Sequence, residues 1–299
     1  MLKFLFSDNI KGSLLVLISA LMFGSYGVFS KYLGQYDVFY QTFVRCLIVT
    51  LCFIGYGISK KQFTPIDQAD RKWFIVILII TNFTIAPIVY AFRFLEIGTA
   101  SFLFYASFTA FTYILGMIFF KEKMDVYKIS SLVLSIIGML LLFSVTFSWM
   151  LLLPMLLAIF NGATSGGEVT FSKKISSNYS NAQINTFVFG SIAVTHFVLS
   201  LVLGENMDVR LFTESLPVLL LFALAAIIAM ATVIAGFKYV EPSIGGIVGL
   251  MEIVFSVILG YFLFQETLNS QAMLGGGLIL LAALIPNIPG LVRMKKNYT

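Results

Sequence analysis

A run without any charged side chain extends from residue 129 to residue 167. As one helix rising 1.5 Å per residue, this run would be about 60 Å long, roughly twice the ~30 Å hydrocarbon layer of a bilayer. The run is therefore too long for a single membrane crossing. We expect two membrane helices here, with the chain folding back at Ser144–Ser148.

The composition of the whole chain also favours a bilayer. Apolar residues make up 59% of the 299 residues, and charged residues make up 11%, against about 25% in soluble domains. The mean hydropathy is +0.98. A net charge of +5 does not indicate nucleic-acid binding, because the basic residues lie in short clusters between apolar runs. We expect contact with lipid and no nucleic-acid partner.

Segments of about 20 apolar residues, the length that crosses a bilayer as a helix, recur along the chain. Ten such segments can be drawn: 11–33, 38–59, 73–92, 97–120, 126–145, 148–172, 182–204, 215–237, 243–264 and 269–290. The predicted fold is therefore an all-α integral membrane protein with ten transmembrane helices. The first segment lacks a cleavage motif, so we expect it to be retained.

The distribution of basic residues predicts the orientation of these helices. Ten crossings place both termini on one side, and that side collects fifteen Lys and Arg residues against three on the other. Because cytoplasmic loops are enriched in Lys and Arg, we predict a cytoplasmic-membrane protein with both termini cytoplasmic.

Short stretches of the chain recur at a nearly constant offset of 142 to 145 residues. The recurring sets are Phe29-Ser30-Lys31 with Phe171-Ser172-Lys173, Thr42-Phe43-Val44 with Thr186-Phe187-Val188, and Phe92-Asp125 with Phe237-Asn269. We interpret residues 1–146 and 147–299 as two repeats of five helices each. An odd number of crossings inverts the second repeat, an arrangement typical of secondary transporters with a central site near the bilayer midplane.

The pattern resembles the ten-helix EamA branch of the drug/metabolite transporter superfamily over nearly the whole chain. The residues that carry the resemblance are Phe23-Gly24-Ser25, Lys31, Phe43-Val44-Arg45, Phe92-Arg93-Phe94, Phe237-Lys238-Tyr239, Lys121-Glu122, Gln265-Glu266 and Gly275-Gly276-Gly277. Thr109 and Ile253 stand where the family commonly has proline. The resemblance implies a secondary transporter, with export of amino acids or similar metabolites.

Two ionisable residues lie deep inside predicted membrane helices, where a charge costs about 2.5–3.5 kcal/mol. Arg45, about two turns from a helix end, could bind a carboxylate or phosphate of a small-molecule substrate, or form a structural pair. Glu252 lies mid-helix and could bind an amine, accept a proton in a coupled cycle, or pair with Arg45. Protons are therefore a candidate coupling ion.

Further candidates for the substrate site are less deeply placed or uncharged. Glu168 follows a polar, glycine-rich stretch and could line the cavity, although close helix packing also explains its glycines. Tyr90 and Tyr105 are candidate lining residues, as are Gln41 and Asn185, which occupy matching positions in the two repeats.

The sequence contains no pattern typical of an enzyme. It has no glycine-rich phosphate loop, no nucleophile elbow and no cluster of metal ligands, so we expect no cofactor and no bound metal. The leading hypothesis is alternating access, in which the halves rock about a central cavity. A membrane-embedded lipid-modifying enzyme and a non-transporting sensor remain as alternatives.

Overall fold

The computed structural model describes residues 8–33, 37–95, 97–142, 149–205, 209–265 and 270–287, and these residues are mainly helical. The α-helices are α1 (Asp8–Gly24), α2 (Tyr26–Tyr32), α3 (Val38–Ser59), α4 (Gln68–Thr81), α5 (Ala86–Phe94), α6 (Ile97–Phe120), α7 (Val126–Leu142), α8 (Leu152–Ile175), α9 (Asn181–Val202), α10 (Val209–Tyr239), α11 (Pro242–Gly249), α12 (Met251–Phe264) and α13 (Ser270–Leu284). The 3-10 turns η2 (Trp149–Leu151) and η3 (Ile285–Asn287) precede α8 and follow α13. All ten predicted ranges contain helix. The reversal predicted at Ser144–Ser148 lies outside the described residues.

Many of these helices are suited to a membrane. Within the described residues, six helical segments are long and apolar enough to cross a bilayer: Val38–Ser59, Gln68–Ile88, Ala100–Phe120, Asn181–Val202, Thr213–Tyr239 and Pro242–Leu263. Val126–Leu142 and Met273–Leu284 are shorter apolar helices. Large apolar side chains such as Val194, Val202 and Phe262 are exposed. Such outward-facing apolar surface is unfavourable in water and is suited to lipid.

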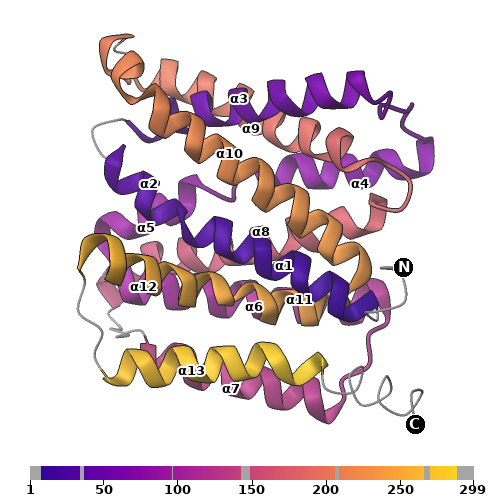
Figure 1. Ribbon diagram of the computed structural model, residues 1–299, viewed down its shortest axis with the longest axis vertical. Helices are drawn as coiled ribbons and strands as arrows, with labels where there is room; N and C mark the ends of the chain where they lie inside the picture. Colours follow the sequence, from indigo (N-terminus) through magenta and orange to yellow (C-terminus); the bar gives the residue numbers. More distant parts are fainter. Residues whose placement is uncertain are drawn as a thin grey trace.

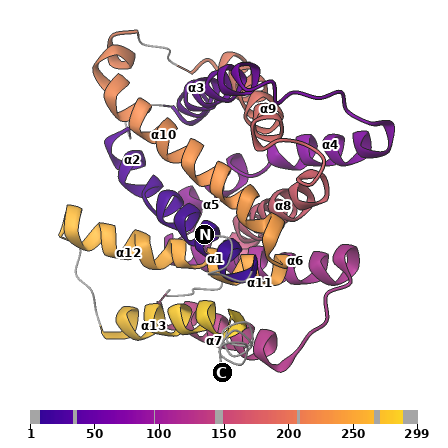
Figure 2. The same cartoon turned by 45° about the vertical axis from the view of Figure 1, so that its right-hand side comes forward.

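The helices are stacked side by side, and they run across the view of Figure 1. The pair α3 and α9 lies at one end of the stack, and the pair α7 and α13 lies at the other (Figures 1 and 2). The most extensive contacts join α3 to α9, α6 to α8, α1 to α10 and α7 to α13. Each of these pairs takes one helix from residues 1–146 and one from 147–299. The two predicted repeats are therefore interleaved rather than packed as separate lobes.

Three of the predicted membrane segments each contain two helices. The breaks fall at Ser25 between α1 and α2, between α4 and α5, and at Leu250 between α11 and α12. Between α4 and α5, the freed carbonyl of Phe83 accepts hydrogen bonds from Asn161 Nδ2 (2.8 Å) and Thr164 Oγ1 (3.2 Å) on α8. These bonds matter because an unpaired backbone carbonyl inside a bilayer costs several kcal/mol.

The loops that follow α3, α6, α8 and α10 lie on one side of the stack, at the right of Figure 1, where these helices end; we call this side the basic end. These loops and the adjoining helix ends carry Lys60, Lys61, Lys121, Lys123, Lys173, Lys174 and Lys238. The helices approach closely at this end. A Cβ atom on Gly12 of α1 would lie 2.9 Å from the carbonyl oxygen of Gly236 on α10, so only glycine permits this crossing.

Lys121 and Gln265 have the same unusual backbone conformation. They directly follow α6 and α12, with φ of 55° and 53° in the left-handed region. Left-handed residues terminate helices because they turn the chain away from the helix axis. The two positions correspond in the predicted repeats, since Lys121-Glu122 matches Gln265-Glu266.

Candidate functional site

A cavity of about 420 Å³ lies between the helices and is lined by residues from both predicted repeats. Its charged lining residues are Arg45 on α3, Glu168 on α8 and Glu252 on α12. Aromatic side chains form much of the remaining wall: Phe23, Tyr26, Phe104, Tyr105, Phe108 and Phe222. A concave apolar cavity with a few convergent polar groups is typical of a small-molecule site.

Arg45 is half-buried and held between aromatic rings. Its Cζ lies 4.3 Å from the ring centroid of Phe222 and 5.2 Å from that of Tyr26. These distances are within the range of cation–π attraction, which is stronger when water is excluded. Its Nε has no hydrogen-bond partner within the described residues. The aromatic rings therefore orient the guanidinium while leaving it able to bind an anionic group.

Glu252 lies in the first turn of α12, where the exposed N–H groups of the helix end favour a negative charge. Its Oε1 accepts a hydrogen bond from the hydroxyl of Tyr105 on α6, at 3.0 Å. The break at Leu250 is what places this helix end, and hence the carboxylate, beside the cavity. Glu252 and Tyr105 together form a polar pair on the cavity wall.

Glu168 is 8% exposed and lies on α8, close to Gly162, Gly166 and Gly167. These glycines let α8 approach its neighbours closely. The peptide bonds of Phe104 and Phe108 on α6 lie directly against the Cα of Gly162, where a Cβ would overlap the carbonyl oxygen of Phe104. The two interpretations of this part of the sequence are therefore compatible, because the glycines allow close helix packing while Glu168 lines the cavity.

The structure brings together four of the seven residues that we selected from the sequence. Arg45, Tyr105, Glu168 and Glu252 line the cavity. The other three lie away from its lining. Gln41 is half-buried on α3, and Asn185 is fully buried and donates to Asn181 on the same helix. Tyr90 is 39% exposed and packs against Phe94. Substrate binding by any of the seven stays a prediction.

Tyr26 is a cavity residue that the sequence analysis did not select. It lines the same cavity as the three charged residues, and its ring centroid lies 5.2 Å from Cζ of Arg45. The recurring Phe-Ser-Lys motif could have identified Tyr26 from the sequence. Tyr26 precedes Phe29-Ser30-Lys31 by the same distance as Glu168 precedes Phe171-Ser172-Lys173. Tyr26 and Glu168 thus occupy equivalent positions in the two predicted repeats.

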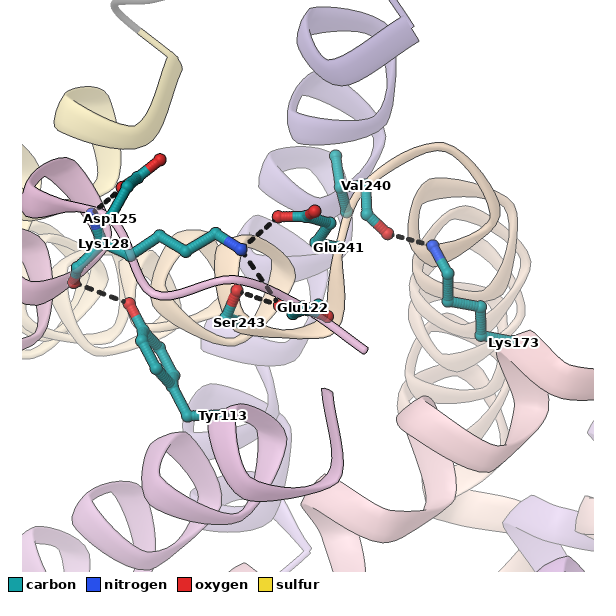
Figure 3. Close-up of polar contacts among 8 residues, drawn as sticks. All are labelled: Tyr113, Glu122, Asp125, Lys128, Lys173, Val240, Glu241 and Ser243. Atoms are coloured by element: carbon teal, nitrogen blue, oxygen red, sulfur yellow. Dashed lines mark hydrogen bonds and ion pairs between the residues drawn. The ribbon is translucent and has the colours of Figure 1, made fainter. Parts of the chain in front are cut away.

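A second polar group lies at the basic end, and we call it the basic-end cluster: Glu122, Lys128, Glu241 and Ser243 (Figure 3). Lys128 Nζ pairs with Oε2 of Glu122 at 3.3 Å and with Glu241, and the hydroxyl of Ser243 donates to Glu122. Glu122 precedes α7 and Lys128 lies on it, whereas Glu241 lies between α10 and α11 and Ser243 is in the first turn of α11. The cluster therefore joins the two predicted repeats.

Burial raises the pKa of Glu122 above its ordinary value, and Glu241 adds to this effect. The hydrogen bond from Ser243 and the charge of Lys128 oppose the increase only in part. Nearby, Lys173 Nζ donates to the carbonyl oxygens of Phe237 (2.7 Å) and Val240 at the end of α10. These contacts fasten α8 to α10 beside the cluster. Glu122, which follows the end of α6, pairs with Lys128 and does not line the cavity.

Comparison with known proteins assigns the chain to a family. The model of the EamA-like transporter family matches residues 10–144 and again residues 152–288. The chain belongs to the EamA-like transporter family. This family membership and the apolar helices identify the protein as a multi-pass membrane transporter homologue.

The chain is similar to one curated protein in sequence and to one solved structure in fold. Over 282 residues the EamA-like chain is 24% identical to an uncharacterized transporter of Archaeoglobus fulgidus, covering 92% of this chain and 95% of that protein. A protein of known crystal structure has the same fold, with a TM-score of 0.80 at 14% identity, covering 93% of this chain and 97% of the other.

Proposed function

We propose that the protein is a secondary transporter that exports small metabolites such as amino acids through the central cavity. The observation that carries the proposal is that Arg45, Glu168 and Glu252 line one cavity in a member of a transporter family. Isolated charges inside a bilayer are costly, and by default they mark a substrate or ion pathway.

The proposed architecture has ten crossings arranged as two inverted repeats, 1–146 and 147–299. The two matches to the family model and the equal backbone conformations of Lys121 and Gln265 support this arrangement. The cavity wall gives further support, because equivalent positions line it in pairs. These pairs are Tyr26 with Glu168, Arg45 with Phe189, and Phe108 with Glu252. In each pair one repeat carries a charge and the other an aromatic ring.

The proposed location is the cytoplasmic membrane, with both termini and the basic end facing the cytoplasm. The excess of Lys and Arg in the loops of the basic end supports this orientation. Arg45 would bind the carboxylate of the substrate, and Glu252 with Tyr105 would bind its ammonium group. A proton taken up by Glu252 would couple transport to a proton gradient.

Alternating access in this fold requires the helices at the basic end to separate. They are fastened there by the basic-end cluster, by Lys173 and by the crossing of Gly12 and Gly236. We take this arrangement as the state that is closed toward the cytoplasm. Because the repeats are interleaved, we expect the moving units to be helix pairs drawn from both repeats, rather than the two sequence halves.

The decisive experiment is counterflow of a radiolabelled amino-acid panel in proteoliposomes, with and without an imposed pH gradient, for the wild type and Glu252→Gln. Saturable counterflow is expected, with loss of gradient dependence in the variant. Counterflow that responds equally to the gradient in both proteins would remove Glu252 as the coupling site. Absence of flux for every amino acid and for a wider metabolite panel would overturn the transporter proposal.

A further inference from the structure

The three charged residues of the cavity are not neutralised by one another. Among the residues that the structure describes, no ion pair joins Arg45, Glu168 or Glu252 to an opposite charge. A buried charge without a partner is strongly unfavourable, and a bound ligand can supply the missing partner. When both carboxylates are ionised they outnumber the single guanidinium, and the cavity then has an excess of negative charge.

A neutral amide on the same helix as Glu168 provides a further acceptor. Asn161 lies seven residues before Glu168 on α8, about two turns away, and is completely buried in the wall of the cavity. Its Nδ2 donates to the carbonyl of Phe83, which fixes the orientation of the amide because only the NH₂ group can donate. Its Oδ1 is left without a hydrogen-bond partner in the described part of the chain. Asn161 thus keeps a buried, unpaired neutral acceptor in the wall of the cavity.

The aromatic wall is also compatible with a cation. Phe104, Tyr105 and Phe108 from α6 face the same cavity as Glu168 and Glu252. Aromatic faces attract cations, and the attraction increases when water is excluded. Tyr26 contributes a hydroxyl among the charged residues, and its ring is already engaged with Arg45. The wall therefore accommodates the apolar stem of a ligand as well as its positive ends.

We propose that the substrate is a basic amino acid, which carries one carboxylate and two cationic groups. This inference rests on the proposed transport function and names the substrate class of the same site. Arg45 binds the α-carboxylate, Glu252 with Tyr105 binds the α-ammonium, and Glu168 binds the side-chain cation. This ligand neutralises all three charged residues at once, whereas a neutral amino acid leaves Glu168 unpaired. The cavity of about 420 Å³ is within the range of small-molecule sites.

The test uses pairs of amino acids that differ in side-chain charge but little in shape. Citrulline replaces the guanidinium of arginine by a neutral urea group, and norleucine lacks the ε-ammonium of lysine. Counterflow and ligand-induced thermal stabilisation are measured for each pair with the wild-type protein. We expect arginine and lysine to exceed their neutral partners by about tenfold or more in apparent affinity, the usual difference made by a charged hydrogen bond.

Three variants assign the effect to Glu168. Glu168→Gln removes the charge at constant shape and should bring arginine and citrulline to within about threefold of each other, whereas Glu168→Asp should keep the preference for arginine. Glu214→Gln is the matched control, because Glu214 is an exposed carboxylate on α10, away from the cavity and paired with Arg210. It should behave as the wild type does.

The outcomes separate this inference from the transport proposal. Transport of neutral amino acids with no preference for arginine over citrulline would overturn the substrate class and leave the transporter intact. A preference that survives in Glu168→Gln would overturn the role of Glu168. Equal loss of both substrates in Glu168→Gln and Glu168→Asp would indicate a structural role and also overturn the proposal. No flux and no stabilisation by any solute would overturn both.

Discussion

Lys128 Nζ lies 3.3 Å from Oε2 of Glu122, and the two side chains are only 5% and 2% exposed. Glu241 approaches the same ammonium from the region between α10 and α11. Lys128 therefore joins the buried carboxylate of Glu122 and the partly exposed carboxylate of Glu241, which belong to parts of the chain more than a hundred residues apart. Removing one member of such a group leaves a buried charge uncompensated.

Replacing Lys128 by methionine should destabilise the protein by about 3 kcal/mol, because Glu122 loses its cation inside the structure. The measurement is thermal unfolding of the purified protein in detergent. Arg210→Met is the control, since the Arg210–Glu214 pair is exposed and such pairs contribute about 0–1 kcal/mol. Adding Glu122→Gln to Lys128→Met should recover part of the loss. Equal effects of Lys128→Met and Arg210→Met would contradict the assignment.

Stability should depend on pH through Glu122. Burial raises its pKa in the folded protein above the ordinary value of 4.5. The folded state therefore holds the proton more tightly than the unfolded state. The contribution of Glu122 is fully present below about pH 4.5 and is lost as the pH rises through the raised pKa. The melting temperature of the wild type should fall relative to Glu122→Gln over this window.

The sign of this pH effect is the discriminating result. If the wild type instead gains stability over Glu122→Gln as the pH rises, the attraction of Lys128 outweighs burial and the folded pKa is depressed. The comparison is made by thermal unfolding from about pH 4 to about pH 8. Lys128→Met serves as an internal check, because it removes the attraction but leaves the burial of Glu122.

Gly162→Ala should destabilise the fold by about 1–3 kcal/mol, because its Cβ would overlap the carbonyl oxygen of Phe104 on α6. Gly55→Ala on α3 is the matched control, since no atom lies within 4 Å of its added Cβ. That substitution should be neutral or stabilising by up to about 1 kcal/mol. Thermal unfolding of both variants tests the close packing of α6 on α8, and equal melting temperatures would argue against it.

Arg45→Lys should weaken substrate binding by about tenfold while leaving the protein folded. Lysine keeps the charge but lacks the planar fork that binds a carboxylate and lies over the ring of Phe222. Half-saturation in counterflow gives the binding change, and gel filtration reports folding. Arg210→Lys, at an exposed position, should leave transport unaltered. Unchanged kinetics in Arg45→Lys would exclude Arg45 from the binding site.

Position along a helix shows why the candidate site was only partly predictable. Gln41 and Arg45 are four residues apart on α3, hence on the same face, and both were selected from the sequence. Only Arg45 lines the cavity. The two residues differ in their position along the helix axis. Which position lies beside the cavity depends on where the facing helices are placed. Tyr26 was overlooked for the related reason that a single tyrosine in an apolar helix resembles any packing residue.

The sequence by itself determined the properties that arise locally. Long uncharged apolar runs predict membrane helices, clusters of Lys and Arg predict one basic side, and the recurring motifs predict a repeat and carry the family resemblance. Only the tertiary structure decided that α3 packs on α9 and α6 on α8, and that the helices break beside the cavity. It also decided that Arg45, Glu168 and Glu252 line one cavity. Hydropathy and charge are additive along the chain, whereas these placements depend on how side chains of distant helices fit together.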